Sequence, residues 1–306
     1  MKLVRFVFMA GMALVLVGCG GEADPVPDTG SGTSTETTTS GTDNVEIPDD
    51  GEDLPDIATA TFSDPLDVDN PWFPLTPGTQ LVFEGNTMDE GEEVHHRIVF
   101  TVTDLTKTID GVPVVVRWDE DYSDGELVEA ELAFFAQDDD GNVWHLGEYP
   151  EEYEEGEMVL APTWLAGLEE AQAGYIMKAD PQPGTPSYAQ GWGPAVEWTD
   201  RGQIDALTGE TCVPTGCYPE TLIIAEWALD ERDLGVQLKY YAKGIGNIKV
   251  GFRDDDATQE ELELIEIIML DEAGLAEVRA KALALEASAY ENSPDVYGET
   301  DPATPR

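Results

Sequence analysis

Carboxylates are the most numerous groups in this sequence that could do chemistry. The 306 residues include 64 Asp and Glu against 15 Lys and Arg, a formal net charge of −49, with 3 histidines as further candidate bases. So strong a negative charge repels polyanions, which excludes nucleic acid as a partner. The sequence has no residue spacing typical of a serine hydrolase, a zinc protease, a P-loop or a dinucleotide site. It therefore predicts no catalytic residue, and a hydrolase that uses carboxylates is kept only as a minor alternative.

One acidic cluster has the composition of a calcium-binding loop. Asp138, Asp140 and Asn142 lie close together at an Asp-Gly turn signal, and carboxylate and amide oxygens are the ligands that calcium prefers. The cluster lacks the EF-hand spacing, and a chain this acidic produces such clusters by composition alone. A calcium-stabilised surface module is therefore an alternative function, and no cofactor other than calcium is expected.

Large aromatic residues are more frequent than a simple β-core requires. Trp118, Phe134, Trp144 and Trp227 lie in segments of strand-like alternation, and His96 falls on the apolar face of its segment. Such residues on a curved sheet can line a cavity for a small apolar molecule or a sugar. The other interpretation, which we prefer, is that the rings fill a wide core and that His96 is a hydrogen-bonded core histidine.

The N-terminus has the pattern of a bacterial export signal. Lys2 and Arg5 precede an apolar run from Phe6 to Val17, which is too short for a stable membrane span. The run ends in Leu-Val-Gly-Cys at 16–19, which resembles the lipobox of bacterial lipoproteins. The resemblance implies that residues 1–18 are removed and that Cys19 carries diacylglycerol and palmitate. We therefore expect a protein of the bacterial cell envelope that this lipid anchors in the outer membrane.

The remaining two cysteines are expected to form a disulfide. An envelope compartment is oxidising, and Cys212 and Cys217 flank the sequence Val-Pro-Thr-Gly, which suits a type I turn. Cysteines on either side of such a turn can face each other across a hairpin. Because the spacing is not C-x-x-C and no basic group is adjacent, we interpret the pair as a structural clip rather than a redox centre.

Strand-like alternation fills most of the chain after the Ser/Thr/Gly-rich stretch at 19–58, which is predicted to be a flexible tether. Asp-Gly and Glu-Gly turn signals separate segments in which apolar and polar residues alternate. This pattern indicates antiparallel hairpins with one buried face and one solvated face. After Gly111, the predicted buried face has Val112, Val114, Val116 and Trp118, and the predicted solvated face has Arg117, Asp119 and Asp121.

The C-terminal part changes to helical periodicity. Asp271 is a suitable N-cap, and the Ser-Pro pair at 293–294 is a stop signal. One face of this helix is apolar and is expected to pack on the protein's own sheet. Its members are Leu275, Val278, Ala282, Leu285 and Ala289.

Long hairpin strands must twist, so the predicted fold class is mainly β, an antiparallel curved meander or partly closed barrel with one C-terminal α-helix. The poorly periodic stretch at 162–193 is interpreted as a crossing loop with a short helical turn at 164–171. The expected parts are a signal peptide (1–18), the tether (19–58), a β-rich domain (59–270), the helix (271–293) and a loose tail (294–306).

Several short strings resemble a recurring set of secreted bacterial β-rich proteins to which no activity is assigned. The resemblance implies one β-rich envelope domain and supplies no reaction or ligand. One departure is Lys243, where the pattern has proline. From the sequence we therefore expect a lipid-anchored binding or structural protein rather than an enzyme. The strings are Asn-Pro-Trp-Phe-Pro-Leu at 70–75, Pro-Gly-Thr at 77–79, Gly-Val at 111–112, Tyr-Ser-Asp-Gly-Glu-Leu-Val at 122–128, Asp-Gly-Asn-Val-Trp at 140–144, Val-Pro-Thr-Gly at 213–216, Lys-Tyr-Tyr-Ala at 239–242 and Gly-Ile-Gly at 244–246.

Overall fold

The computed structural model describes residues 54–89, 91–229, 232 and 235–306. The predicted signal peptide, Cys19 and most of the predicted tether lie outside these residues. The short 3-10 helix η1 (Ile57–Thr59) is capped by Asp56, and Ile57 packs against the hydrophobic core. The folded part therefore begins slightly before the predicted boundary at residue 59. Among the described residues, no helix combines the length and apolar character needed to cross a membrane.

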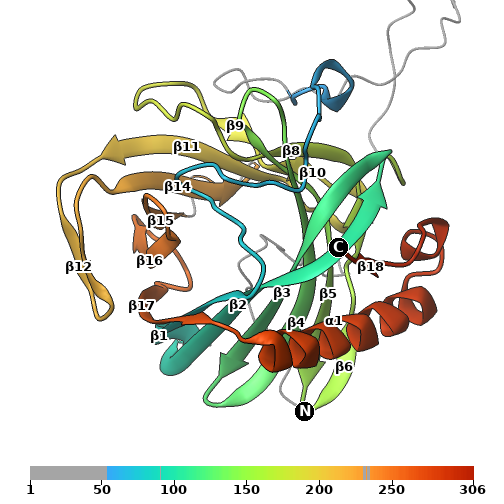
Figure 1. The fold of residues 1–306 in the computed structure, drawn as a ribbon. Coiled ribbons are helices and arrows are strands. Elements are labelled where there is room, and N and C mark those ends of the chain that lie inside the picture. Colours follow the sequence, from blue (N-terminus) through green and yellow to red (C-terminus); the bar gives the residue numbers. More distant parts are fainter. Residues whose placement is uncertain (1–53, 90, 230–231, 233–234) are drawn as a thin grey trace, which may run out of the picture.

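One large antiparallel sheet makes up most of the fold (Figure 1). Consecutive hairpins build one half, and a second run of neighbouring strands builds the other half. The two halves meet where the first strand pairs with the last long strand. The predicted fold class, a curved antiparallel meander with one helix, is confirmed. The first half contains β1 (Thr79–Asp89), β2 (Glu92–Ile109), β3 (Val112–Ser123), β4 (Glu126–Gln137) and β5 (Val143–Glu154), and the second contains β11 (Asp200–Leu207), β14 (Leu222–Ala228), β15 (Val236–Ala242), β16 (Gly246–Arg253) and β17 (Glu261–Met269).

Two-residue turns connect the long hairpins as the turn signals predict. Asp110 and Gly111 have φ angles of 47° and 79°, and Asp124 and Gly125 have φ angles of 49° and 86°. Positive φ at both central positions is typical of the turn whose twist matches paired strands. The turns thereby place β2, β3 and β4 side by side in register.

The two edges of the sheet are brought together by one short segment. Strand β9 (Tyr188–Ala189) pairs with β11 at one edge. Two residues later, β10 (Gly191–Trp192) pairs with β8 (Gln172–Met177) next to the other edge. The ladder does not close into a barrel, but the sheet curls into an incomplete ring that encloses an interior (Figure 1).

The prediction of a crossing loop with a helical turn between residues 162 and 193 is wrong. This stretch contains β7 (Trp164–Leu165), β8, β9 and β10, and β6 (Glu157–Leu160) precedes it. Strands of two residues are too short to show a period-two pattern, so periodicity could not reveal them. A Cβ on Gly174 would lie 2.3 Å from the backbone nitrogen of Gly191. The glycines here allow backbones to approach closely, which is the role of glycine in such a strand.

The helix packs on the outer face of the sheet, as the sequence predicts. α1 (Glu272–Asn292) begins after Asp271, whose side chain accepts a hydrogen bond from the Gly274 backbone N–H. Val278, Ala282, Leu285 and Ala289 are buried in the outer core, the cluster between α1 and the outward faces of β2 to β5. Leu275 is half-buried. Because the sheet is covered on this side, the outer core is the largest apolar region of the described chain.

The C-terminal segment is packed rather than loose, which corrects the predicted tail. The Tyr297 side chain is 0% exposed, and β18 (Thr304–Pro305) pairs with β2. The buried carboxylate of Glu286 accepts hydrogen bonds from Lys107, from the Tyr297 hydroxyl and from the Ala303 backbone. The sequence pattern missed this because Glu286 is a charged residue beside the apolar stripe of the helix.

The predicted disulfide is confirmed. Cys212 and Cys217 lie opposite each other on β12 (Thr211–Val213) and β13 (Gly216–Tyr218) and are joined. The bond closes a small hairpin whose two strands form a sheet of their own (Figure 1). Val213 of this hairpin packs in a buried cluster with Phe83 and Leu262 of the main sheet.

Replacement of Tyr297 tests whether the C-terminal segment belongs to the fold. Tyr297→Ala removes a fully buried ring and is expected to lower the free energy of unfolding by about 3 kcal/mol or more. The measurement is urea unfolding followed by tryptophan fluorescence. Glu299→Ala, at an exposed position in the same segment, serves as the control and should change stability by less than about 0.5 kcal/mol. If both substitutions change the free energy of unfolding by the same small amount, the C-terminal segment is a loose tail, as the sequence predicts.

Candidate binding cavity

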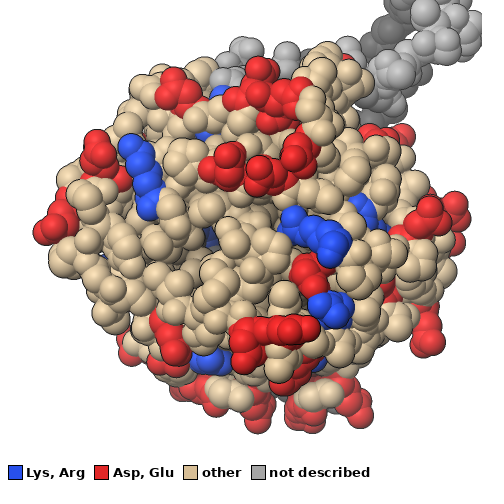
Figure 2. Space-filling model, viewed as in Figure 1, with Lys and Arg blue, Asp and Glu red and all other residues tan. Residues whose placement is uncertain are grey.

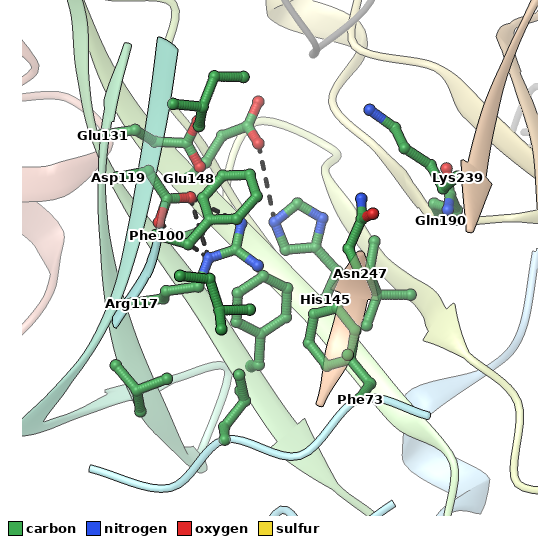
Figure 3. A pocket seen from close by; sticks show the side chains of 18 of the residues that line it. Phe73, Phe100, Arg117, Asp119, Glu131, His145, Glu148, Gln190, Lys239 and Asn247 are labelled. Carbon is green, nitrogen blue, oxygen red and sulfur yellow. Dashed lines mark hydrogen bonds and ion pairs between the residues drawn. The ribbon is translucent and has the colours of Figure 1, made fainter. Parts of the chain in front are cut away.

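The interior of the curled sheet contains a cavity of about 150 Å³. Phe73 and Leu75 line part of it and belong to a second buried apolar cluster, which we call the inner core. Strands β3, β4 and β5 contribute one side, and β14 and β15 contribute the opposite side (Figure 3). A cavity of this size accommodates a molecule about as large as benzene.

The face that the sequence predicts to be solvated lines this cavity. Arg117, Asp119 and Asp121 of β3 point inward, whereas Val114, Val116 and Trp118 point outward under α1. The predicted alternation of the two faces is confirmed. The prediction that the polar face is solvated is wrong, because the sheet curls over this face and encloses it. A single strand carries no information about such curling.

Like charges face each other directly across two strands inside the cavity. The backbone register places Asp119 opposite Glu131 and Asp121 opposite Glu129. Directly opposed like charges are destabilising in an antiparallel pair, and more so away from solvent. Glu148 on the neighbouring strand β5 adds a further carboxylate. We call Asp119, Glu129, Glu131 and Glu148 the acidic wall.

Arg117 neutralises one member of the acidic wall. Its Nε and Nη2 donate to the two carboxylate oxygens of Asp119, at 2.9 Å and 2.6 Å. The guanidinium also lies over the rings of Phe100 and Phe135, at 4.5 Å and 4.8 Å from their centroids. Because its donors are directed at Asp119 and its faces contact aromatic rings, Arg117 is a fixed part of the cavity wall.

The other carboxylates of the acidic wall hold protons more strongly than usual. Burial and the charge of Asp119 raise the pKa of Glu131 to about 8. Burial, Glu131 and Asp200 raise the pKa of Glu148 well above its ordinary range. Burial, Glu131 and Asp121 do the same to the pKa of Glu129. Glu129 and Glu131 keep part of their surface exposed because they face the cavity. Perturbed carboxyl groups that converge in a cavity are typical of functional sites.

His145 lies between the acidic wall and a group of aromatic rings. It is 4% exposed, and backbone groups of Gly147 and Gln190 lie within hydrogen-bonding reach of its ring. Its Nε2 is 3.7 Å from an oxygen of Glu148 (Figure 3). Burial and the charge of Arg117 lower the pKa of His145 to about 3, so the ring is neutral. It stacks on Phe135 with a centroid distance of 5.0 Å and contacts Trp198 edge to face.

A buried lysine lies on the opposite side of the cavity (Figure 3). Lys239 of β15 is 4% exposed, and its ammonium makes no hydrogen bond to any described residue. Glu226 of β14 is nearby: burial raises its pKa, while the charge of Lys239 opposes this shift. Gln190 donates to Glu226 at 2.8 Å. We call Lys239, Glu226 and Gln190 the lysine wall.

His96 lies in a buried ionic bridge. Its Nε2 is 2.6 Å from Asp121 and its Nδ1 is 2.6 Å from Glu260. Burial alone would lower its pKa, but the hydrogen bonds and charges of Asp121 and Glu260 together raise it to about 10. His96 is therefore a charged structural group that links β2, β3 and the loop before β17.

The aromatic residues selected from the sequence do not line the cavity. Trp118, Phe134 and Trp144 belong to the outer core, and Trp227 packs in a separate cluster on β14 and β15. The rings that do line it are Phe73, Phe100, Phe135, Trp198 and Tyr241. The sequence could have indicated Phe135. It is separated from Glu129 and Glu131 by an even number of residues along β4, so the three side chains lie on the same face of the sheet.

The predicted calcium loop is held together by its own hydrogen bonds. Asp138 accepts from the Asn142 backbone and from the Trp144 indole N–H, both at 2.8 Å. The Asn142 side-chain oxygen accepts from the Ala179 backbone, and Asp140 is exposed. These contacts give the turn a structural role, and its calcium site stays a prediction.

Comparisons with known proteins leave the family open. No protein-family model matches the sequence, and no curated protein matches it. A Bacteroides fragilis structure, described as an exported protein with a YmcC-like fold, is 14% identical, with a TM-score of 0.38 over 64% of this chain and 98% of that one. A Parabacteroides distasonis structure, described as a lipoprotein, is also 14% identical, with a TM-score of 0.31 over 65% of this chain and 100% of that one. Both TM-scores are below 0.5, so the function is argued from this chain's own residues.

The acidic wall makes stability depend on pH. The folded-state pKa of Glu131, about 8, exceeds the ordinary value of 4.5, so folding takes up a proton between these pH values. The wild-type protein therefore loses stability as the pH rises from about 4.5 to about 8. Glu131→Gln cannot ionise and is expected to gain about 2 kcal/mol or more over wild type at pH 8, and little at pH 4.5.

Urea unfolding across this pH range gives the comparison. Glu126→Gln, at an exposed position on the same strand, is the control and should follow the wild-type pH profile. A stability difference between Glu131→Gln and wild type that stays constant with pH would contradict the assignment.

Proposed function

We propose that this protein is a lipid-anchored protein of the bacterial cell envelope that binds a small molecule inside its curled sheet. The observation that carries the proposal is a set of buried polar groups that line one cavity and make no hydrogen bond in the described chain. These groups are the Lys239 ammonium and the Trp198 indole N–H.

Unsatisfied buried groups are costly, and their concentration at one place favours a ligand. A buried polar atom without a partner costs about 1–3 kcal/mol, and a charged one more. Most buried polar groups in proteins have a partner, so each exception calls for an explanation. A ligand that fills the cavity with acceptors and donors would recover this cost.

Binding is favoured over catalysis by the state of the carboxylates. A hydrolase is the second candidate, because Glu131 opposes Asp119 and can hold a proton at neutral pH. Both oxygens of Asp119, however, accept hydrogen bonds from Arg117. They are therefore poorly placed to attack a substrate or to activate water, and the cavity has a better geometry for holding a molecule than for cleaving one.

The envelope location rests on the N-terminal sequence. The apolar run and the Leu-Val-Gly-Cys string at 16–19 support lipidation of Cys19 and anchoring in the outer membrane. The hairpin disulfide fits an oxidising compartment.

Metabolic labelling tests the anchor. Cells that produce the wild-type chain with radiolabelled palmitate are expected to yield a labelled protein in the outer-membrane fraction, and Cys19→Ser should abolish the label. Cys212→Ser with Cys217→Ser is the matched control, because it removes two cysteines and leaves the lipobox intact. An unlabelled wild-type protein, or one recovered among cytosolic proteins, would refute the anchor.

Analysis of small molecules released from the purified protein tests the cavity. The mature chain, isolated from its own envelope, is denatured, and the released molecules are identified by liquid chromatography and mass spectrometry. Wild type is expected to release a stoichiometric small molecule, and Lys239→Met is expected to lose it while folding normally, because Met fills the space without a buried charge. Lys281→Met on the outer helix is the control. Failure of wild type to release any such molecule would count against the binding function.

A further inference from the structure

We infer that the ligand of this cavity carries an ammonium group that contacts the acidic wall and a hydrogen-bond acceptor that contacts Lys239, as amino acids and amino alcohols do. The inference rests on the proposed binding function and specifies the chemical class of the ligand.

The ammonium end follows from carboxylates that have no cation. Arg117 neutralises Asp119, and His96 neutralises Asp121. No basic side chain of the described chain comes within ion-pair distance of Glu129 or Glu131, and the nearest basic residue to Glu148 is the neutral His145. A primary ammonium has three donors on a compact charge and can therefore bind two carboxylates at once and still donate to a third acceptor.

The acceptor end follows from Lys239. Its ammonium is buried, lines the cavity and makes no hydrogen bond in the described chain. Glu226, the carboxylate on the same wall, already accepts a hydrogen bond from Gln190. A carboxylate or hydroxyl oxygen of the ligand would give Lys239 the partner that the protein does not supply.

The positions of the two walls set the polarity of the ligand. The acidic wall lies on β3, β4 and β5, and Lys239 lies on β15 across the cavity, as Figure 3 shows for Glu131, Glu148 and Lys239. A ligand with opposite groups at its two ends satisfies both walls. A ligand with negative groups at both ends would be repelled by the acidic wall, and one with positive groups at both ends would be repelled by Lys239.

An organic ammonium fits the acidic wall better than a metal ion does. The described residues contain one group whose potential metal-ligand atoms all lie within 4.8 Å of one another, and it consists of Glu210 with the disulfide-bonded Cys212 and Cys217. No three carboxylates of the acidic wall therefore converge closely enough to chelate an ion, whereas an ammonium can be held by two. A cavity of about 150 Å³ offers room for a short carbon chain between two polar ends.

Ligand binding should release protons. Glu131 faces several charged groups, and an added ammonium favours its ionised form. Affinity for an ammonium ligand is therefore expected to rise between about pH 5 and pH 8, the range in which Glu131 would otherwise keep its proton. The charged or titratable groups around Glu131 are Arg117, Asp119 and Asp121 on β3, Glu129 on its own strand, His145 and Glu148 on β5, and Asp200, Glu226 and Lys239 across the cavity.

Four compounds with the same carbon count test the polarity directly. The probes are 4-aminobutyrate, 1,4-diaminobutane, 1,4-butanediol and succinate, and calcium chloride serves as the metal probe. Their binding to the full mature chain in lipid nanodiscs is measured by isothermal titration calorimetry at several pH values, in buffers of different ionisation enthalpy. We expect 4-aminobutyrate to bind at least about tenfold more tightly than the other probes, with proton release.

Two substitutions assign the ends of the ligand. Lys239→Met should remove the preference for 4-aminobutyrate over 1,4-diaminobutane. Glu131→Gln should weaken both amines by about tenfold and reduce the number of protons released. Lys281→Met and Glu126→Gln, which lie outside the cavity lining, are the matched controls and should bind like wild type.

The other outcomes separate this inference from the proposed function. Tightest binding of succinate, butanediol or calcium would overturn the ammonium end and leave the binding function in place. Tightest binding of the diamine would overturn the role of Lys239. If no probe binds at millimolar concentration while the purified protein still releases a Lys239-dependent molecule, the ligand class is wrong and the binding function stands. If neither is observed, both fail.

Discussion

Burial of a charged sheet face is the constraint on which the rest of this structure depends. Moving carboxylates out of water is expensive unless each finds a positive partner with good geometry. Two ionic contacts meet that condition here: Arg117 with Asp119, and His96 with Asp121 and Glu260. The His96 bridge links β2, β3 and the loop before β17, so these compensated charges also hold together the strands that carry them. Among the described residues, the other carboxylates of the acidic wall form no ion pair with an Arg or Lys side chain, and the nearby charge of Arg117 compensates Glu131 and Glu148 only in part.

The two faces of the sheet consequently have different roles. The outer core between α1 and β2 to β5 is apolar and closely packed, and the C-terminal segment completes it through Tyr297. The one deeply buried charge pair on this side, Lys107 with Glu286, is surrounded by further hydrogen bonds that satisfy the carboxylate. On the inner face, the Lys239 ammonium and the Trp198 indole N–H have no hydrogen-bond partner among the described residues. Carboxylates of β3 also lie directly opposite carboxylates of β4 on this face. A stable outer face allows an inner face whose residues are unfavourable for folding, which is the pattern expected of a functional site.

Local patterns in the sequence were sufficient for the long strands, the hairpin turns, the disulfide and the helix. Each of these depends on residues close together in the chain: alternation in β3 and β4, Asp-Gly at positions with positive φ, and the cap and apolar stripe of α1. The cavity depends on the pairing of Ala189 with Arg201 and of Gly191 with Ala173, which joins distant edges through strands of two residues. No periodicity marks such strands. For that reason Trp118 and Trp144 were candidate ligand contacts, whereas Phe100, His145 and Lys239 were not recognised.

The electrostatic field of the whole molecule favours cations, as the acidic wall does. With a formal charge of −49, the protein attracts cations and repels anions over distances of about a Debye length. Acidic side chains are more prominent than basic ones on the face shown in Figure 2. A zwitterion has no net charge to be repelled, but its ammonium end is drawn toward such a surface first. Lys239 is buried on the far side of the cavity from the acidic wall, so its attraction for an acceptor acts only after the ligand has entered. Long-range charge would therefore orient the ligand, and Lys239, which has no hydrogen-bond partner among the described residues, would retain it.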